Sequence, residues 1–494
     1  MTELPSDIWR HIAGFIPVAI LLTLYSVNRT FLQVARENRY RAIDFVAYKS
    51  SKLLIKHIKC SPLVHSVRIK PWIVSPKEPR SSFWSPATWK TLNSCISSRS
   101  FDEDPDAQVA RRLQKQVRLV TEAIRGLPNL HTYHIDWDGA PIRPEYLTAL
   151  LDSLIPAIGH NLSTLSLKVP LHYMHSLPRL ANPLSQLQSI AVTIHTASHV
   201  ARDISEKMEG LVVFLNTLLR NLRSISIQTT PTSTYLDLGL LFAPLGRGRR
   251  LTSFTLYIPF DGGHLPNPKS LRKFLINHSS TLESLTLGTT RAAAHHAPSA
   301  STNNYWIRDA VVNHPPFPSL SCLSLALRPL RINLAPLIKC LTGMRPHLRM
   351  LKLTERALEY AELVRVLDAL HDAPLLRVLS IRVRWLSPEV IDRLAATLPN
   401  LTVLCLSFAE VVHHEPAGSV CSGLSVDSYG LSRESELMLF FRELEGKNYS
   451  RWNLSRLAVP ECPRGQMKWL DAMGQAFVRC IPGLMTFEEL VSTV

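Results

Sequence analysis

One short pattern recurs through the chain and limits what it can fold into. An apolar residue is followed by two variable residues, a second apolar residue, one variable residue and a third apolar residue. The pattern is clear in "LESLTL" (282–287) and "LRMLKL" (348–353). Its last three positions alternate with a period of two, which predicts a short strand with one buried face. Further copies lie at 130–135, 162–167, 187–192, 222–227, 251–256, 320–325, 376–381, 401–406 and 454–459, with a poorer copy at 64–69.

Helix-like stretches separate these strands. The spacing of their apolar residues predicts helices at 144–158, 206–219, 360–372 and 387–398, the last with Ser387 as its cap. One strand and one helix cannot bury their apolar faces alone, whereas stacked copies share a continuous core. We therefore expect an α/β solenoid with a parallel strand layer and a helix layer.

This pattern resembles the leucine-rich repeat with longer helices, over about residues 60–480. The resemblance implies a solenoid that binds other proteins. The sequence departs from the family three residues after the last apolar position, where Asn or Cys is usual. Without that hydrogen-bonded asparagine ladder, we expect uneven curvature. The residues found there are Pro170, Thr230, Thr290, Arg328, Arg356 and Arg384.

The most apolar stretch of the chain lies near its N-terminus. No charged residue occurs between Ile12 and Val27, a run of 16 residues. A membrane-spanning helix needs roughly 20 such residues, and Pro17 interrupts this run. Acidic residues, Glu3 and Asp7, precede it, whereas a signal peptide begins with basic ones. The stretch therefore favours short helices over a membrane segment.

Three short helices account for this stretch. Pro5 begins the first, with Ile8, Ile12 and Phe15 on one face, and Pro17 ends it. A second follows Pro17, and Asn28 can cap a third. Helices this short bury little surface, so they must pack on the rest of the chain or on a partner.

The segments "LPSDIWRHIAGF" (4–15) and "LLTLYSVNRTFLQVA" (21–35) resemble the F-box, a helical module of ubiquitin-ligase adaptors. The sequence departs from the family at Asp7, where Glu is commoner, and at "PVAI" (17–20), where the family is usually polar. The resemblance implies docking to a Skp-type adaptor and, through it, to a cullin–RING ligase. The alternative is an amphipathic cap on the domain that follows. The residues expected to contact the adaptor are Leu4, Pro5, Ile8, Ile12, Phe15, Leu21, Leu24, Val27 and Phe31.

The sequence thus predicts two parts. Residues 1–38 form the helical module, and residues 39–484 form the solenoid, which begins with a strand at 40–45 and a helix at 49–60. Irregular insertions are expected at 71–104, 288–319 and 410–431, where the repeat is broken. Such loops either contact partners or are disordered.

Basic residues are concentrated in two places. The chain has a net charge of +16, and the first 126 residues contribute 20 − 10 = +10. The second place is a set of repeats 28 residues apart, which predicts one row of arginines at the strand ends. A row of guanidinium groups suits an acidic or phosphorylated segment of a target protein, although the side chains can also splay into solvent. The residues expected to bind the target are Arg328, Lys352, Arg356, Arg382 and Arg384.

Motifs for catalysis are missing from the sequence. It contains no HExxH, no GxSxG and no phosphate-binding glycine loop, and the pairs His295-His296 and His413-His414 have no further ligands at set spacing. We expect neither a metal nor a cofactor. The eight cysteines form no CxxC, which favours a reduced protein of the cytoplasm or nucleus.

Three functions remain for such a chain. The first is a non-catalytic substrate adaptor of a Skp–cullin–F-box type ubiquitin ligase, which leads to degradation of the bound target. The second is a leucine-rich-repeat scaffold without a ligase. The third is a basic nucleic-acid-associated protein, although the aromatic and basic residues do not interleave as on an RNA-binding surface.

Overall fold

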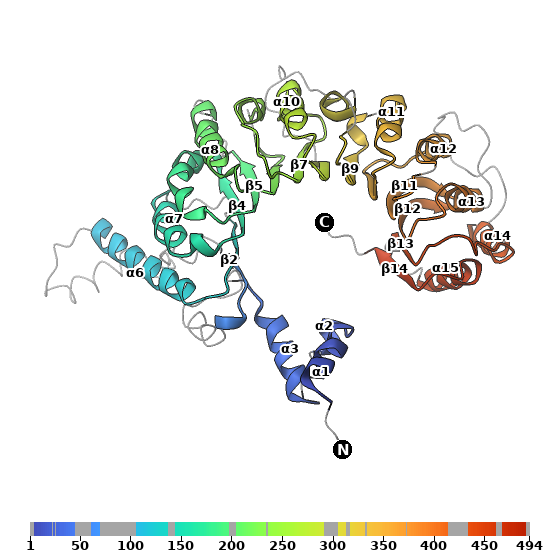
Figure 1. Cartoon of the computed structure of the whole chain (residues 1–494), viewed down its shortest axis with the longest axis horizontal. Helices are drawn as coiled ribbons and strands as arrows, with labels where there is room; N and C mark the ends of the chain where they lie inside the picture. Colours follow the sequence, from blue (N-terminus) through green and yellow to red (C-terminus); the bar gives the residue numbers. More distant parts are fainter. Residues whose placement is uncertain are drawn as a thin grey trace, which may run out of the picture. The chain divides into compact units, whose positions relative to one another are not determined.

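The computed structural model describes the chain with gaps, and its strands and helices form two compact units, Met1–Arg223 and Ser224–Val494. In each unit the strands lie side by side, and the helices that alternate with them cover one face of the sheet (Figure 1). The described residues are 4–21, 23–24, 26–44, 61–69, 105–136, 144–196, 204–233, 236–290, 305–312, 317–330, 333–371, 373–412, 433–460 and 467–490.

The first unit begins with three short helices, α1 (Ser6–Gly14), α2 (Val18–Leu21) and α3 (Arg29–Tyr40). Its strands pair in chain order and in parallel. The strands are β1 (Ala42–Asp44), β2 (Ser66–Ile69), β3 (Thr132–Asp136), β4 (Thr164–Pro170) and β5 (Ser189–His195). The connecting helices are η1 (Ser61–Leu63), α6 (Pro105–Arg125), α7 (Pro144–Ile158), η3 (Gly159–Asn161), η4 (Leu171–Leu180), η5 (Asn182–Leu184) and α8 (Ile204–Leu218).

The second unit continues the same plan with parallel strands in chain order. Its strands are β6 (Ser224–Thr229), β7 (Ser253–Pro259), β8 (Ser284–Thr290), β9 (Cys322–Ala326), β10 (Met350–Thr354), β11 (Val378–Leu386), β12 (Val403–Val411), β13 (Arg456–Pro460) and β14 (Thr486–Leu490). Its helices are α9 (Gly239–Phe242), α10 (Lys269–Asn277), η7 (Arg308–Val312), η8 (Arg328–Leu330), α11 (Ala335–Met344), α12 (Tyr360–Ala369), α13 (Pro388–Thr397), α14 (Arg433–Glu445) and α15 (Met467–Cys480).

The predicted repeat register is confirmed. The middle leucines of five successive copies pair with one another from β8 to β12 and are all buried. Because every strand presents its apolar positions to the same side, the helices cover one unbroken apolar layer. The leucines are Leu285, Leu323, Leu351, Leu379 and Leu404.

The expected α/β solenoid is therefore confirmed, since every copy of the pattern found in the sequence lies on a strand. The predicted helices are present as α7, α8, α12 and α13. Ser387 stands at the N-cap of α13, as predicted. Its hydroxyl, however, has no hydrogen-bond partner and so forms no capping bond. Pro388 at the first helical position presets the backbone there instead.

Two expectations about the solenoid need correction. The segment 288–319 is not wholly irregular, because Gly288 to Thr290 end strand β8 and the π-helix η7 lies beside α10 and α11. Trp306 is fully buried just before η7, so apolar burial keeps this part in the helix layer. The solenoid also extends past 484, because β14 adds a strand at its end. Its pattern was missed because Glu489 occupies the last apolar position.

Other expectations fall outside the described residues. These are the insertion 71–104, the helix at 49–60 and most of the segment 410–431, of which Glu410 and Val411 end strand β12. None of the helices in the described part of the chain has the length and hydropathy that crossing a bilayer requires.

Candidate partner-binding surfaces

The three N-terminal helices share a small core. Phe31 of α3 is buried, and the ring of Trp9 from α1 packs edge-on against it with centroids 5.3 Å apart. Ala13 and Leu21 complete the buried part. A core this small holds the helices together but leaves many of their apolar residues exposed.

Two polar contacts fix the arrangement of these helices. The Asn28 side chain accepts a hydrogen bond of 2.8 Å from the Phe31 N–H, as the predicted N-cap of α3. Arg10 of α1 forms an ion pair of 3.1 Å with Glu37 of α3. Because both ends of the ion pair are solvent-exposed, it orients the helices more than it stabilises them.

Apolar side chains are exposed along α1 and at the ends of α2. Leu4 is 50% exposed, Ile8 44%, Ile12 36% and Phe15 77%. Val27, between α2 and α3, is 59% exposed. Single exposed apolar residues are ordinary, whereas several together mark an interaction site. We call Leu4, Ile8, Ile12, Phe15 and Val27 the N-terminal apolar surface.

The structure divides the residues expected to contact an adaptor. The N-terminal apolar surface accounts for five of them, and Pro5 is exposed beside it. Leu21 and Phe31 instead belong to the core of the three helices, and Leu24 packs against that core. A sequence pattern cannot separate these two roles, because core and contact residues are equally apolar.

Two apolar residues of α2 are also exposed, although the sequence pattern did not include them among the expected contact residues. Val18 is 54% exposed and Ile20 is 52% exposed. The departure from the family at "PVAI" concealed them, since these positions are usually polar there. Val18 also borders a groove of about 430 Å³ between α2 and α3. The other residues lining this groove are Leu32, Ala35, Arg36, Asn38, Arg39 and Tyr40.

The sheet of the second unit has one face that none of the described helices covers (Figure 1), and we call it the open face. From β6 to β9 this face presents a row of hydroxyl groups in register, one per strand. The row is uncharged and half-buried. Its residues are Ser226, Thr255, Thr286 and Ser324.

Basic side chains first occur in this row of the open face at β10. Lys352 continues the hydroxyl row, with Ser324 on one side and Ser380 on the other. Arg382 lies two residues further along β11 and is level with Ser407 of β12. Lys352 and Arg382 are both exposed.

The arginines at the strand ends are each held by a local partner. Arg328 is exposed and lies over the Phe260 ring, 4.5 Å from its centroid. Arg356 forms an ion pair of 2.9 Å with Glu362 of α12, which is only 8% exposed. The guanidinium of Arg356 is therefore bonded within the fold.

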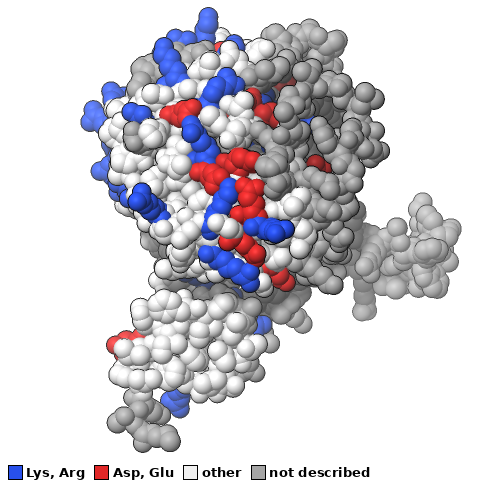
Figure 2. All heavy atoms as spheres, turned by 90° about the vertical axis from the view of Figure 1, so that its right-hand side faces the viewer, with Lys and Arg blue, Asp and Glu red and all other residues white. Residues whose placement is uncertain are grey.

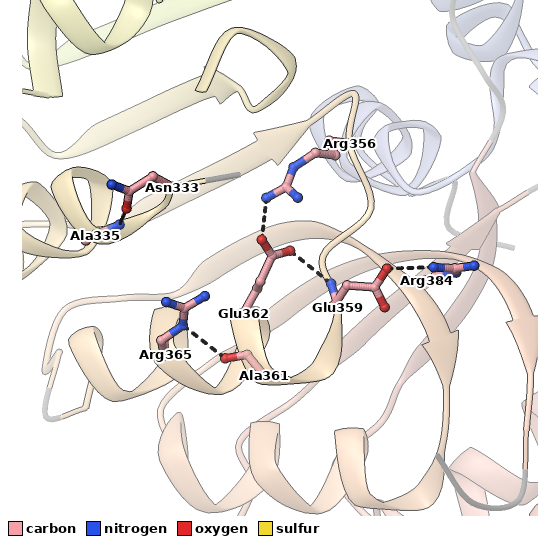
Figure 3. A network of polar contacts seen from close by, with 8 residues as sticks. All are labelled: Asn333, Ala335, Arg356, Glu359, Ala361, Glu362, Arg365 and Arg384. Atoms are coloured by element: carbon pink, nitrogen blue, oxygen red, sulfur yellow. Dashed lines mark hydrogen bonds and ion pairs between the residues drawn. The ribbon is translucent and has the colours of Figure 1, made fainter. Parts of the chain in front are cut away.

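Arg384 and the start of α12 belong to the same polar network (Figure 3). The Arg384 guanidinium donates to Glu359 Oε1 at 2.8 Å and also lies over the Trp385 ring. Glu359 N–H in turn donates to the Glu362 carboxylate at 3.2 Å. Each arginine thus neutralises one glutamate at the N-terminus of α12.

The predicted row of three arginines is wrong between β10 and β11. The two strands pair with an offset of 378 − 350 = 28 residues, but beyond the strand Leu358 is level with Val383, an offset of 25. The chain loops out at 355–357, so Glu359 rather than Arg356 comes beside Arg384. Residues that are equally spaced in the sequence stay level with one another only while the two strands pair without an interruption.

Charges also gather on the helix layer of the second unit, where basic and acidic side chains alternate (Figure 2). Ion pairs join each helix from α12 to α15 to the next, so this face has no field of a single sign. The pairs are Arg393–Asp368, Lys447–Asp392 at 2.5 Å, Lys447–Glu443 at 2.9 Å and Arg479–Glu445 at 2.5 Å.

No arrangement for catalysis emerges among the described residues. Burial raises the pKa of the Cys405 thiol on the open face, although Arg456 and Lys352 act in the opposite direction. In the described part of the chain, no cluster of three or more His, Cys, Asp or Glu is placed to hold a metal ion. The pairs His295-His296 and His413-His414 lie outside the described residues.

Comparisons with known proteins give little further information. No protein-family model matches the chain, and no curated protein is significantly similar to it. One similar solved structure is the yeast Rad7 and Elc1 complex, with 16% identity, 66% of this chain and 88% of that chain covered, and a TM-score of 0.35. Another is the TLR13–ssRNA13 complex, with 14% identity, coverage of 76% and 40%, and a TM-score of 0.31. Because both TM-scores are below 0.5, the fold assignment rests on the strand order and register.

Proposed function

We propose that this chain is a non-catalytic substrate adaptor of a Skp–cullin–F-box type ubiquitin ligase, acting in the cytoplasm or nucleus. Residues 1–38 dock a Skp-type adaptor, and through it a cullin–RING ligase. The solenoid binds a target protein and holds it near the ubiquitin-charged enzyme. Ubiquitin transfer to the target is then accelerated by proximity, since a bound target reacts as if it were present at high local concentration.

The N-terminal apolar surface is the observation that carries this proposal. Ile8 and Ile12 lie one turn apart on α1 and Phe15 is its C-cap residue, so the three present one apolar face. The core formed by Phe31 and Trp9 keeps α1 on α3. A partner therefore meets apolar side chains that are already positioned, which lowers the entropy cost of binding.

The target-binding part of the proposal concerns the open face and its strand ends. Arg328, Lys352 and Arg382 are exposed there with no acid paired to them among the described residues, so they give the surface a basic character, and Arg384 is exposed beside its partner Glu359. Arg356 contributes through its bond to Glu362, which fixes the start of α12. An acidic or phosphorylated target segment matches these charges.

The test is binding of the purified full-length chain to a purified Skp-type adaptor, measured by calorimetry. We expect the double variant Ile8→Ser/Phe15→Ser to lose binding by about a hundredfold, as for central interface residues. The matched control is Val213→Ser/Ile276→Ser, which changes two exposed residues on α8 and α10. The control should bind like the unaltered chain.

Two results would contradict the adaptor proposal. One is a folded full-length chain that binds no Skp-type adaptor. The other is equal loss of binding in the control, which would indicate non-specific adhesion of apolar residues. In either case the scaffold function, which needs only the solenoid, would replace it.

A further inference from the structure

Next to the cations, the open face carries an exposed apolar row. Met350 of β10 is 40% exposed, and Val378 of β11 and Val403 of β12 are half-buried. The three residues are in register on adjacent strands. Neighbouring strands lie about 4.8 Å apart, so the row is about 10 Å long.

The cations flank this apolar row on one side. Lys352 follows Met350 by two residues along β10, and Arg382 follows Val378 by four along β11. Two residues of a parallel strand advance by about 6.6 Å, so Lys352 lies about 6.6 Å along the strand from the apolar row and Arg382 lies about 13 Å from it. Within the described residues, neither Lys352 nor Arg382 forms an ion pair.

Other charged side chains around this patch have partners within the fold. Arg384 is paired with Glu359, and Arg456 of β13 forms an ion pair of 2.6 Å with Glu488 of β14. The Glu355 carboxylate is bonded to Thr289. Within this patch, Lys352 and Arg382 are therefore two cations that have no acid paired to them among the described residues, so an incoming negative charge can bind at either.

We propose that the open face over β10 to β12 binds an extended protein segment that combines apolar residues with two acidic side chains. The apolar residues cover Met350, Val378 and Val403, and the two carboxylates reach Lys352 and Arg382. Hydroxyl groups of Ser380 and Ser407 stand beside the two cations as further donors. This deepens the proposed function, on which it rests, by giving the chemical class of the target segment.

The arrangement favours two carboxylates over a phosphate or a nucleic acid. Lys352 and Arg382 lie on different strands and at different levels, so two separate single charges fit them. Nucleic acid would need cations along its backbone, whereas the adjoining hydroxyl row from β6 to β9 carries none. The apolar row also has no counterpart in a phosphate backbone.

The test uses the full-length chain and a fluorescent peptide of about twelve residues that repeats Ser-Leu-Glu, with binding measured by anisotropy. Lys352→Glu/Arg382→Glu should weaken binding by about tenfold or more, and Met350→Ser should also weaken it. Replacing every Glu of the peptide by Gln, or every Leu by Ser, should have effects of similar size. Higher salt should weaken binding of the Glu peptide but not binding of the Gln peptide.

Matched variants on the helix layer serve as controls. Arg272→Glu/Lys273→Glu reverses two exposed charges on α10, and Met438→Ser alters an exposed methionine of α14. Both should bind the peptide like the unaltered chain, and circular dichroism should show all variants folded.

The proposal is overturned if the unaltered chain does not bind the Glu peptide, or if Lys352→Glu/Arg382→Glu binds it equally well. It is also overturned if a phosphoserine version or an oligouridylate binds at least tenfold more tightly than the Glu peptide. No Skp-type adaptor is present in this assay, so its failure leaves the docking result for the N-terminal apolar surface untouched.

Discussion

The Glu355 carboxylate accepts hydrogen bonds from both the backbone N–H and the hydroxyl of Thr289, 66 residues earlier in the chain. Glu355 follows strand β10, Thr289 lies in β8, and β9 stands between them. The Glu355 backbone is left-handed, with φ of 74°. Glycine is the usual residue for this conformation, and a side chain there costs about 1–2 kcal/mol. The bonds to Thr289 offset that cost and fix the loop that separates Arg356 from Arg384.

Substituting Glu355 separates strain from bonding. Glu355→Ala keeps the strained backbone and loses both bonds, so we expect the free energy of unfolding to fall by about 1–3 kcal/mol. Glu355→Gly loses the same bonds but relieves the strain, so it should be more stable than the alanine variant by about 1 kcal/mol. Urea denaturation followed by circular dichroism measures both. An alanine variant at least as stable as the glycine variant would refute the role of backbone strain.

Truncating a repeat leucine tests the shared core. Leu351→Ala leaves a cavity between β10 and the helix layer, and we expect a loss of about 2–5 kcal/mol in the free energy of unfolding. Lys352→Ala, the next residue on the exposed side of the same strand, should change it by less than about 0.5 kcal/mol. The same urea experiment compares the two. Equal effects would mean that the strand does not divide a buried from an open side.

Two arginines of one network should differ in their contribution to stability. Arg356→Met leaves the Glu362 carboxylate, 8% exposed, without its ion-pair partner, so we expect a loss of about 1–3 kcal/mol. Arg384→Met breaks a more exposed pair and should cost less than about 1 kcal/mol. Thermal unfolding can rank the two variants. The reverse ranking would indicate that the bond to Glu362 does not hold α12.

Acid should destabilise the second unit through His278. Its Nε2 accepts a hydrogen bond of 2.8 Å from the Gly248 N–H, while Nδ1 donates to the Phe274 carbonyl at 2.7 Å. Burial lowers the pKa of His278, against the effect of the Phe274 carbonyl. The folded state therefore disfavours the proton, and the stabilisation is complete above the unfolded pKa of about 6.5 and is lost as the pH falls below it.

The check is unfolding in urea between pH 7.5 and 5.5. The midpoint should fall with pH in the unaltered chain, and the slope should be smaller in His278→Gln. His264 is buried too, and its pKa is also lowered by burial, so some slope should remain in that variant. An unchanged slope in His278→Gln would show that this histidine does not titrate across the range.

The repeat fold could be predicted from the order of apolar residues along the chain. Its apolar positions recur with the period of a strand and then of a helix, and only stacking can bury both faces. Hence the strands, their common register and the helices at 144–158 and 387–398 could be predicted without coordinates. Glu489 concealed the last strand, because pairing with β13 continues where the apolar pattern stops. Backbone hydrogen bonds do not require an apolar side chain.

Which side chains are exposed, by contrast, depends on how the helices and strands pack. The pattern at the N-terminus could not separate Phe31, which is buried in the core, from Phe15, which is 77% exposed. Both are aromatic residues at helical spacing, and exposure depends on which helix face meets another. Likewise, equal spacing placed Arg356 beside Arg384, whereas a three-residue loop brings Glu359 there. Hydrogen bonds to residues distant in the sequence, such as Thr289, set the path of that loop, and no local pattern records them.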